Sequence, residues 1–290
     1  MAVIAVNFGA GSRNRSRLSR AIVPLISDTT RVLARARSNG LTSVGSMRRI
    51  GALLVLLLVA TACGSGTSAT DSTEVSFTPG ERSFGQVTID GTVVEYISLV
   101  PAGFSTGDTA PVLLALPPGA QDAGMATAIV RDILQVEALA RGWVVVSPAA
   151  PDGELFFQGS ERFIPGFIDF IESWVSPEGG GVHLAGVSNG GISSFRVATQ
   201  NPDRFRSVTV FPGFPTSDAD IEALDALTHL PVHMFVGERD TGWIDPMESA
   251  ANRLTELGAD VTYEVFPNEG HIIGTLGDGV RVFDGLDAAR

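Results

Sequence analysis

Short apolar runs alternate with segments of helical periodicity from about residue 84 to the C-terminus. The runs have the length and composition of buried strands: "PVLLAL", "WVVVSP", "VHLAGV", "RSVTV", "PVHMFV" and "DVTYEVF". Between them lie segments with apolar residues at helical spacing, such as 126–141 and 246–257. Repeated strand–helix units form a mostly parallel central sheet with helices on both faces. The alternation therefore predicts one α/β domain over residues 84–290.

The segment that precedes these units has a different pattern. In "GQVTIDGTVVEYISLV", Asp90 and Gly91 separate two runs in which apolar and polar residues alternate. This pattern is typical of two strands joined by a tight turn. We expect an N-terminal antiparallel hairpin that enters the parallel sheet.

The stretch "MRRIGALLVLLLVATAC" contains two Arg, an apolar run of 13 residues from Ile50 to Ala62, and the only cysteine of the chain, Cys63. A membrane-spanning helix needs about 20 apolar residues, so this run is more typical of a secretory signal. Small residues before the cysteine resemble a bacterial lipobox. We predict that Cys63 is lipidated and holds the protein at a membrane surface.

These features divide the N-terminal region into three parts. Residues 47–62 are predicted to be a lipoprotein signal peptide, and residues 63–83 a polar, flexible tether. Residues 1–46 are rich in Arg and Ser. We expect them to be an extended N-terminus, or to lie upstream of a true start at Met47. The protein is then extracytoplasmic and anchored to the cell membrane by its lipid.

Charge is unevenly distributed along the chain. Residues 1–62 contain nine Arg and one acid, whereas residues 63–290 contain 11 Arg and 31 acids. Because residues 63–290 carry a large excess of negative charge, they repel the phosphate backbone, and no nucleic-acid partner is expected. One cysteine and four scattered histidines form no ligand cluster, so neither a metal nor another cofactor is expected.

The spacing G-x-S-x-G occurs twice, around Ser105 in "GFSTG" and around Ser188 in "GVSNG". A nucleophilic serine of this type needs a strand before it, a tight turn and a helix after it. Ser105 lies in a loop between two strands, with Pro and Gly on either side. Ser188 follows "VHLAGV" and precedes a helical segment. A phosphate-binding junction is the alternative, but the usual glycine spacings are absent. Ser188 is therefore the predicted nucleophile.

A serine nucleophile needs a base, and the base needs a carboxylate that orients it. His183 and His233 lie in predicted buried strands, and His229 lies at a helix end. Only His271, in "FPNEGH", lies in a glycine-flanked loop after the last predicted strand. His271 is the predicted base.

The carboxylate is expected after a strand between the serine and the histidine. Asp240 in "VGERD" meets this condition, with Glu238 and Asp245 as alternatives in the same loop. The chain order of serine, aspartate and histidine is that of one known triad arrangement.

The motifs "GVSNGG", "VGERDTGW" and "YEVFPNEGH" resemble the α/β-hydrolase superfamily. More narrowly, they resemble its secreted esterases of the polyhydroxybutyrate-depolymerase-like and dienelactone-hydrolase-like branches. The resemblance covers nearly all of the chain after Phe84, and it implies the α/β-hydrolase fold. Relatives usually have His-Gly after the third strand, where this chain has "LPPGAQ".

That loop is expected to supply half of an oxyanion hole, which needs two backbone N–H donors. One donor is Asn189, the residue after the serine. Pro117 and Pro118 have no N–H and are excluded. Ala120 is the predicted second donor, with Gln121 and Gly119 as alternatives.

The sequence thus predicts a secreted, lipid-anchored serine hydrolase that cleaves small-molecule or polymeric esters through an acyl-enzyme. Phe157, Phe214 and Trp243 are candidates for an apolar acyl pocket, although each could equally belong to the core. A serine peptidase of the same fold is one alternative, because S-N-G-G turns also resemble those of prolyl-oligopeptidase-like enzymes. A non-catalytic binding module is another, which a complete triad disfavours.

Overall fold

The computed structural model describes residues 75–290. The predicted signal peptide, the Cys63 lipidation site and most of the predicted tether lie outside the described residues. Within residues 75–290, no helix combines the length and the apolar character that a membrane crossing requires.

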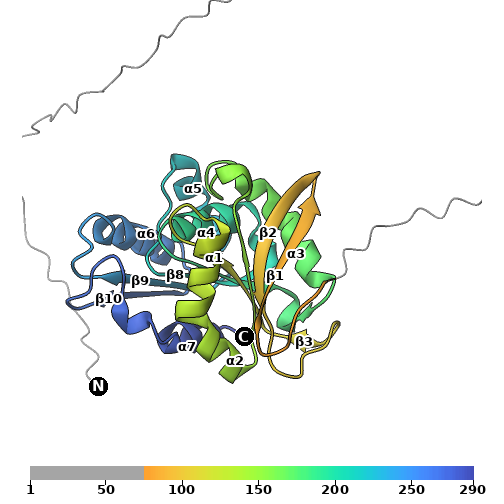
Figure 1. The fold of residues 1–290 in the computed structure, drawn as a ribbon. Coiled ribbons are helices and arrows are strands. Elements are labelled where there is room, and N and C mark those ends of the chain that lie inside the picture. The colour runs from red at the N-terminus through yellow and green to blue at the C-terminus, as the bar shows by residue number, and fades with distance from the viewer. Residues whose placement is uncertain (1–74) are drawn as a thin grey trace, which may run out of the picture. The chain divides into compact units, whose positions relative to one another are not determined.

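Eight strands form one sheet in the order β1-β2-β5-β4-β7-β8-β9-β10 (Figure 1). β1 (Arg82–Ile89) and β2 (Thr92–Leu99) pair antiparallel, and β2 pairs antiparallel with β5 (Val144–Pro148). All later neighbours are parallel: β4 (Val112–Leu116), β7 (Val182–Gly186), β8 (Phe205–Val210), β9 (Val232–Gly237) and β10 (Val261–Phe266). The predicted hairpin and mostly parallel sheet are confirmed.

The turn of the hairpin explains why its sequence contains Asp-Gly. Asp90 and Gly91 both have positive φ, at 51° and 79°. Two consecutive residues of positive φ form the tight turn that matches the twist of two paired strands. A short parallel pair, β3 (Thr109–Ala110) with β6 (Ser176–Pro177), lies outside the main sheet.

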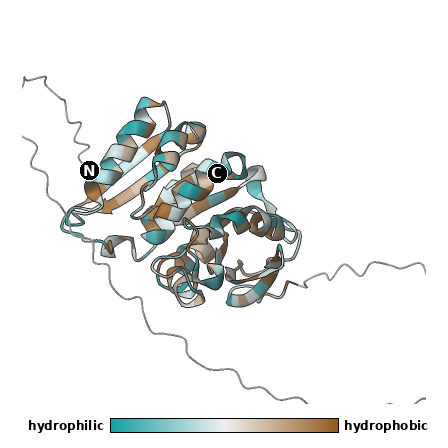
Figure 2. Ribbon diagram, turned by 90° about the horizontal axis from the view of Figure 1, so that it is seen from above, coloured by the Kyte–Doolittle hydropathy of each residue, from teal (hydrophilic) through white to brown (hydrophobic). Residues whose placement is uncertain are grey.

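Helices cover both faces of the sheet (Figures 1 and 2). One apolar core contains Leu114 and Leu116, and the other contains Leu113 and Ala115 of the same strand, as the twofold period of a strand requires. The first core includes residues of α3 (Ile164–Glu172), α4 (Asn189–Gln200) and α6 (Ile244–Glu256). The second includes residues of α1 (Ala123–Ile129), a π turn (Val130–Leu134), α2 (Gln135–Arg141) and α7 (Val280–Ala288). The short helix α5 (Asp218–Glu222) follows β8.

The packed region begins before the predicted boundary at residue 84. The ring of Phe77 lies 5.5 Å from that of Phe104 and 5.6 Å from that of Trp174, measured between centroids. Val75 also packs against the core. Phe77 thus belongs to an aromatic cluster of the domain, although its flanking sequence is typical of a linker.

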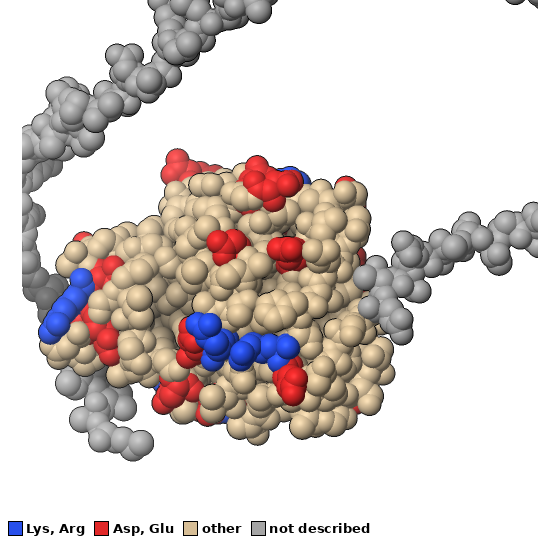
Figure 3. Space-filling view, viewed as in Figure 1, with Lys and Arg blue, Asp and Glu red and all other residues tan. Residues whose placement is uncertain are grey.

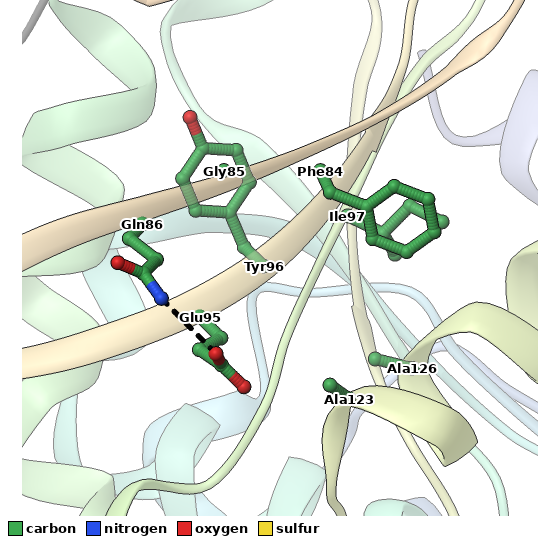
Figure 4. A pocket seen from close by; sticks show the side chains of 8 residues that line it. All are labelled: Phe84, Gly85, Gln86, Glu95, Tyr96, Ile97, Ala123 and Ala126. Atoms are coloured by element: carbon green, nitrogen blue, oxygen red, sulfur yellow. Dashed lines mark hydrogen bonds between the residues drawn. The ribbon is translucent and has the colours of Figure 1, made fainter.

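Tyr96 and Gly85 are paired across the hairpin, and the tyrosine ring lies against the glycine (Figure 4). A Cβ atom at Gly85 would overlap the ring, which explains the glycine. Beside this pair, a hollow of about 360 Å³ lies between the hairpin and α1. Neither Ser188 nor His271 lines it.

Ion pairs neutralise much of the positive charge on the folded body. Arg141 binds Glu137 at 2.7 Å, Asp284 at 2.9 Å and Asp287 at 2.8 Å. On the face seen in Figure 3, the basic groups lie directly beside acidic ones, so this face has no extended basic patch.

Candidate active site

Ser188 lies in the turn between β7 and α4, with φ of 56° and ψ of −119°. A positive φ is strained for a residue with a side chain, and such residues cluster at functional sites. The turn leaves no room for side chains beside the serine. A Cβ atom at Gly186 would overlap the carbonyl of Gly190, and one at Gly190 would overlap the carbonyl of Leu116. The two glycines of the motif are therefore steric requirements of the turn.

The structure brings the three predicted residues together. His271 Nδ1 lies 2.8 Å from Asp240 Oδ2, and His271 Nε2 lies 2.8 Å from Ser188 Oγ. A carboxylate accepts hydrogen bonds only, so Nδ1 carries the proton and Nε2 is free to accept the serine O–H. Asp240 is 9% exposed and His271 is 40% exposed at its side chain. The arrangement can transfer a proton from the serine to an imidazole that the aspartate orients.

Glu238 and Asp245, the alternative carboxylates, and Ser105, the alternative serine, are not part of this hydrogen-bond chain. Glu238 accepts a hydrogen bond from the backbone N–H of Asn268 at 2.8 Å. Asp245 is in the first turn of α6. Ser105 lies in the loop before β3, where its N–H donates to Asp108 at 2.8 Å. None of these three side chains forms a hydrogen bond with His271 among the described residues.

Aromatic rings pack against the candidate triad. The centroid of Trp243 lies 4.8 Å from that of His271, and Phe214 packs edge-on against Trp243 at 5.0 Å. This contact restricts rotation of the imidazole. Both aromatic residues also pack against the core.

A cavity of about 480 Å³ opens beside Ser188. Its walls come from α1 with the π turn, from the loop after His271, and from Val187 and Phe211. The predicted pocket residues Phe157, Phe214 and Trp243 do not line it. The sequence did not identify this cavity, because both walls are apolar segments that resemble ordinary core.

Comparisons with known proteins address the fold. No protein-family model matches this sequence, and no curated protein matches it either. Solved structures do resemble it. A thermostable esterase matches with a TM-score of 0.55 at 14% identity, over 71% of this chain and 61% of that one. The S-formylglutathione hydrolase of Agrobacterium tumefaciens matches with a TM-score of 0.55 at 13% identity, over 72% and 94%. The chain has the α/β-hydrolase fold.

The fold also occurs in a peptidase-type protein. A predicted dipeptidyl aminopeptidase IV of Bacteroides ovatus matches with a TM-score of 0.55 at 15% identity, over 72% of this chain but 35% of that one. This chain therefore spans about a third of that protein and less than two thirds of the thermostable esterase. At such identities the likeness establishes the α/β-hydrolase fold alone.

In the α/β-hydrolase fold, an oxyanion hole takes one N–H from the residue after the nucleophile and one from an earlier strand–helix loop. Asn189 is the first residue of α4, so its N–H has no acceptor within the helix. The N–H of Gln121 donates to Pro118 O at 3.0 Å and is occupied. Gly119 lines the cavity at Ser188, whereas Ala120 does not. Asn189 does not line the cavity either, so Ala120 stays the predicted second donor and Gly119 stays an alternative.

Gln121 anchors this loop in the absence of the His-Gly pair. The side chain is fully buried, and its Nε2 donates to Pro117 O at 3.1 Å and to Ser193 Oγ at 3.0 Å. Its Oε1 accepts from the N–H of Phe156 at 2.8 Å. Asn189 Nδ2 adds a hydrogen bond to Gly119 O at 2.8 Å. The sequence feature that could have indicated this anchoring role is the amide of Gln121, which follows the apolar stretch "LPPGA" shortly before α1.

Proposed function

We propose that this protein is a serine hydrolase that cleaves carboxylic esters, with Ser188 as nucleophile, His271 as base and Asp240 as its orienting carboxylate. The observation that carries the proposal is the continuous hydrogen-bond chain Asp240–His271–Ser188, built on a strained turn at the start of a helix. The adjacent cavity gives a substrate access to the serine.

In the first half of the reaction, Ser188 Oγ attacks the ester carbonyl carbon while its proton moves to His271 Nε2. The carbonyl π electrons move to the oxygen, and the N–H groups of Asn189 and of Ala120 or Gly119 stabilise the oxyanion. When the intermediate collapses, the bond to the alcohol oxygen breaks. That oxygen takes the proton from His271, and the acyl group remains on Ser188.

The second half repeats these steps with water. His271 accepts a proton from the water, whose oxygen attacks the acyl carbon and forms a second oxyanion at the same donors. Collapse breaks the bond to Ser188 Oγ, which regains its proton from His271. The products are a carboxylic acid and an alcohol, and the enzyme returns to its starting state.

Labelling with a fluorophosphonate probe, followed by peptide mapping, tests the nucleophile. We expect label on Ser188 in the wild type and none after His271→Ala. Ser105→Ala is the matched control and should label like the wild type. A folded protein that takes no label would support a non-catalytic binding module instead, and label on Ser105 would overturn the choice of serine.

Peptide hydrolysis is the competing activity, because a peptidase-type protein shares the fold. Purified protein should be assayed with a p-nitrophenyl ester and with aminoacyl and dipeptidyl p-nitroanilides. The proposal predicts turnover of the ester with little or no release of nitroaniline. Preferred cleavage of the anilides would replace the esterase assignment with a peptidase.

We further propose that Cys63 carries a lipid that anchors the enzyme at the extracytoplasmic membrane surface. The support is the lipobox-like sequence before the cysteine. The acidic balance of residues 63–290 likewise supports the proposal that nucleic acid is not a partner. Expression in a lipoprotein-competent host should give a mass shift on the Cys63 peptide that Cys63→Ser abolishes. An unmodified Cys63 in secreted protein would contradict the anchor.

A further inference from the structure

One wall of the cavity beside Ser188 is a helix face. Met125, Ala128 and Ile129 of α1 line it, and Ile133 of the π turn continues the row. Residues three and four positions apart lie on one side of a helix, so these side chains form a continuous strip. The strip is apolar except at Asp132, which lines the cavity between Ile129 and Ile133.

The opposite wall is the loop that begins at His271. Ile272, Ile273 and Leu276 line the cavity from this side. The carboxylate of Glu269 holds the loop, because it accepts hydrogen bonds from the N–H groups of Gly274 at 3.1 Å and Thr275 at 3.2 Å. The proposed base and the second apolar wall are therefore parts of one short, braced segment.

Charged groups are scarce in the cavity. Of the lining residues, only His271 and Asp132 have side chains that can carry a charge at neutral pH. The Asp132 carboxylate lies 2.6 Å from the guanidinium of Arg131. No arginine is among the lining residues. A substrate chain that carries a carboxylate finds no cation among the lining residues, and it would lose its water contacts in a mostly apolar cavity. A hydroxyl-rich chain would lose its water contacts without finding enough new partners.

We infer that this cavity binds an apolar chain of intermediate length on one arm of the ester, an assignment that rests on the proposed function. Its volume of about 480 Å³ corresponds to roughly 16 groups of the size of a water molecule, enough for an ester group, a chain of roughly six to eight carbons on one arm and a short group of about five atoms on the other. Ile272 is 86% exposed at the lining of the cavity. The apolar surface thus continues to the solvent, and a longer chain extends past it.

The test is a chain-length profile of kcat/KM on both arms of the ester. One series holds p-nitrophenol constant and varies the acyl group from two to twelve carbons. The other holds acetate constant and varies the n-alkyl alcohol. Each buried methylene contributes about a fourfold gain when fully removed from water. In one series we expect at least a tenfold rise to a maximum near six to eight carbons. A p-nitrophenyl succinate monoester should be cleaved at least tenfold more slowly than the butyrate.

Two substitutions in the cavity and one control outside it assign the effect to this cavity. Ala128→Phe fills the space beside the helix strip and should lower the ratio of hexanoate to acetate kcat/KM at least fivefold. Ala140→Phe places the same side chain at an exposed position of α2 outside the cavity and should keep the wild-type ratio. Ile272→Asn alters an exposed side chain, so it carries little folding risk. It should lower the ratio for octanoate to acetate.

The outcomes separate this inference from the proposed function. Turnover of acetate esters with flat profiles on both arms would overturn the apolar-chain assignment and leave the serine hydrolase intact. So would a preference for the succinate monoester, or a folded Ala128→Phe variant with the wild-type ratio. Absence of both turnover and fluorophosphonate label at Ser188 would overturn both.

Discussion

Two serine–histidine pairs in this molecule have nearly the same separation but different surroundings. His271 Nε2 lies 2.8 Å from Ser188 Oγ, and His183 Nδ1 lies 2.7 Å from Ser207 Oγ. The first pair is in loops at the carboxyl edge of the sheet. The second joins neighbouring strands β7 and β8 inside the domain.

The surroundings differ in three physical respects. His271 is partly exposed and has Asp240 on its other nitrogen, whereas His183 is 1% exposed and packs edge-on against Trp143 at 4.9 Å. Ser188 is on a strained turn, and Ser207 is within strand β8. Burial lowers the pKa of His183 to about 4, so its imidazole is neutral at neutral pH. The comparison teaches that a short serine–histidine distance alone does not identify a nucleophile. Access and an orienting carboxylate are also needed.

Removing each serine hydroxyl in turn is the strongest test of the difference between the two pairs. Ser188→Ala should lower ester kcat by about 10⁴-fold or more, because the reacting atom is lost. Ser207→Ala should leave kcat within about twofold. It should also lower the free energy of unfolding by about 1–3 kcal/mol, since a buried histidine loses its partner. Initial rates and urea denaturation measure the two effects. Equal losses of activity in both variants would abolish the distinction.

Replacing the orienting carboxylate should have the next largest effect. Asp240→Asn removes the charge that selects the Nδ1–H tautomer, and kcat should fall by about 10³–10⁴-fold. Asp245→Asn is the matched control, at a neighbouring acid without contact to His271, and should retain wild-type kcat. A large loss at Asp245 with little at Asp240 would assign the role to the other carboxylate.

The loop beside Ser188 is held in place by hydrogen bonds of the buried Gln121 side chain. The His183–Ser207 pair has no such loop beside it among the described residues, because both residues lie in strands. Gln121→Leu should lower kcat by about 10- to 100-fold with a smaller change in KM, because a displaced N–H of the loop that Gln121 anchors stabilises the oxyanion less well. Gln121→Glu preserves the shape and the acceptor for the Phe156 N–H, but it places a buried carboxylate oxygen against Pro117 O and should lose at least as much activity. The exposed Gln158→Leu serves as control. An unchanged kcat in a folded Gln121→Leu variant would exclude this positioning role.

The smallest expected effect is on stability and concerns His183. The pKa of His183 in the folded protein is about 4, below the ordinary value of 6.5. Above pH 6.5 the imidazole is neutral in both the folded and the unfolded chain, so its full contribution to the free energy of unfolding is present. That contribution is lost as pH falls from 6.5 towards 4, because the unfolded chain takes up the proton first. Between pH 7 and pH 5 the wild type should lose about 2 kcal/mol more than His183→Gln. Urea denaturation at both pH values measures this difference. Parallel losses in the two proteins would show that His183 does not titrate in this way.

Much of the α/β-hydrolase fold could be predicted from the sequence, because its signals are local. Strands of apolar residues, helical periodicity and the Asp90-Gly91 turn each depend on a few neighbouring residues. The same holds for Ser188, since a strand, small residues and a helix are adjacent along the chain. His271 and Asp240 followed from their places after strands, although only the structure separates Asp240 from Glu238 and Asp245.

Contacts between distant segments were decided by the tertiary structure. Gln121 reaches Ser193, 72 positions along the chain, and this contact holds the loop whose residues Pro118 and Gly119 line the cavity. Phe77 joins the aromatic cluster although its flanking sequence is polar. The sequence by itself determined the order of strands and helices along the chain and pointed to Ser188 and His271, whereas the tertiary structure selected Asp240 among three acids. Loop conformation, which depends on partners far away in the chain, determined which apolar walls lie beside the serine.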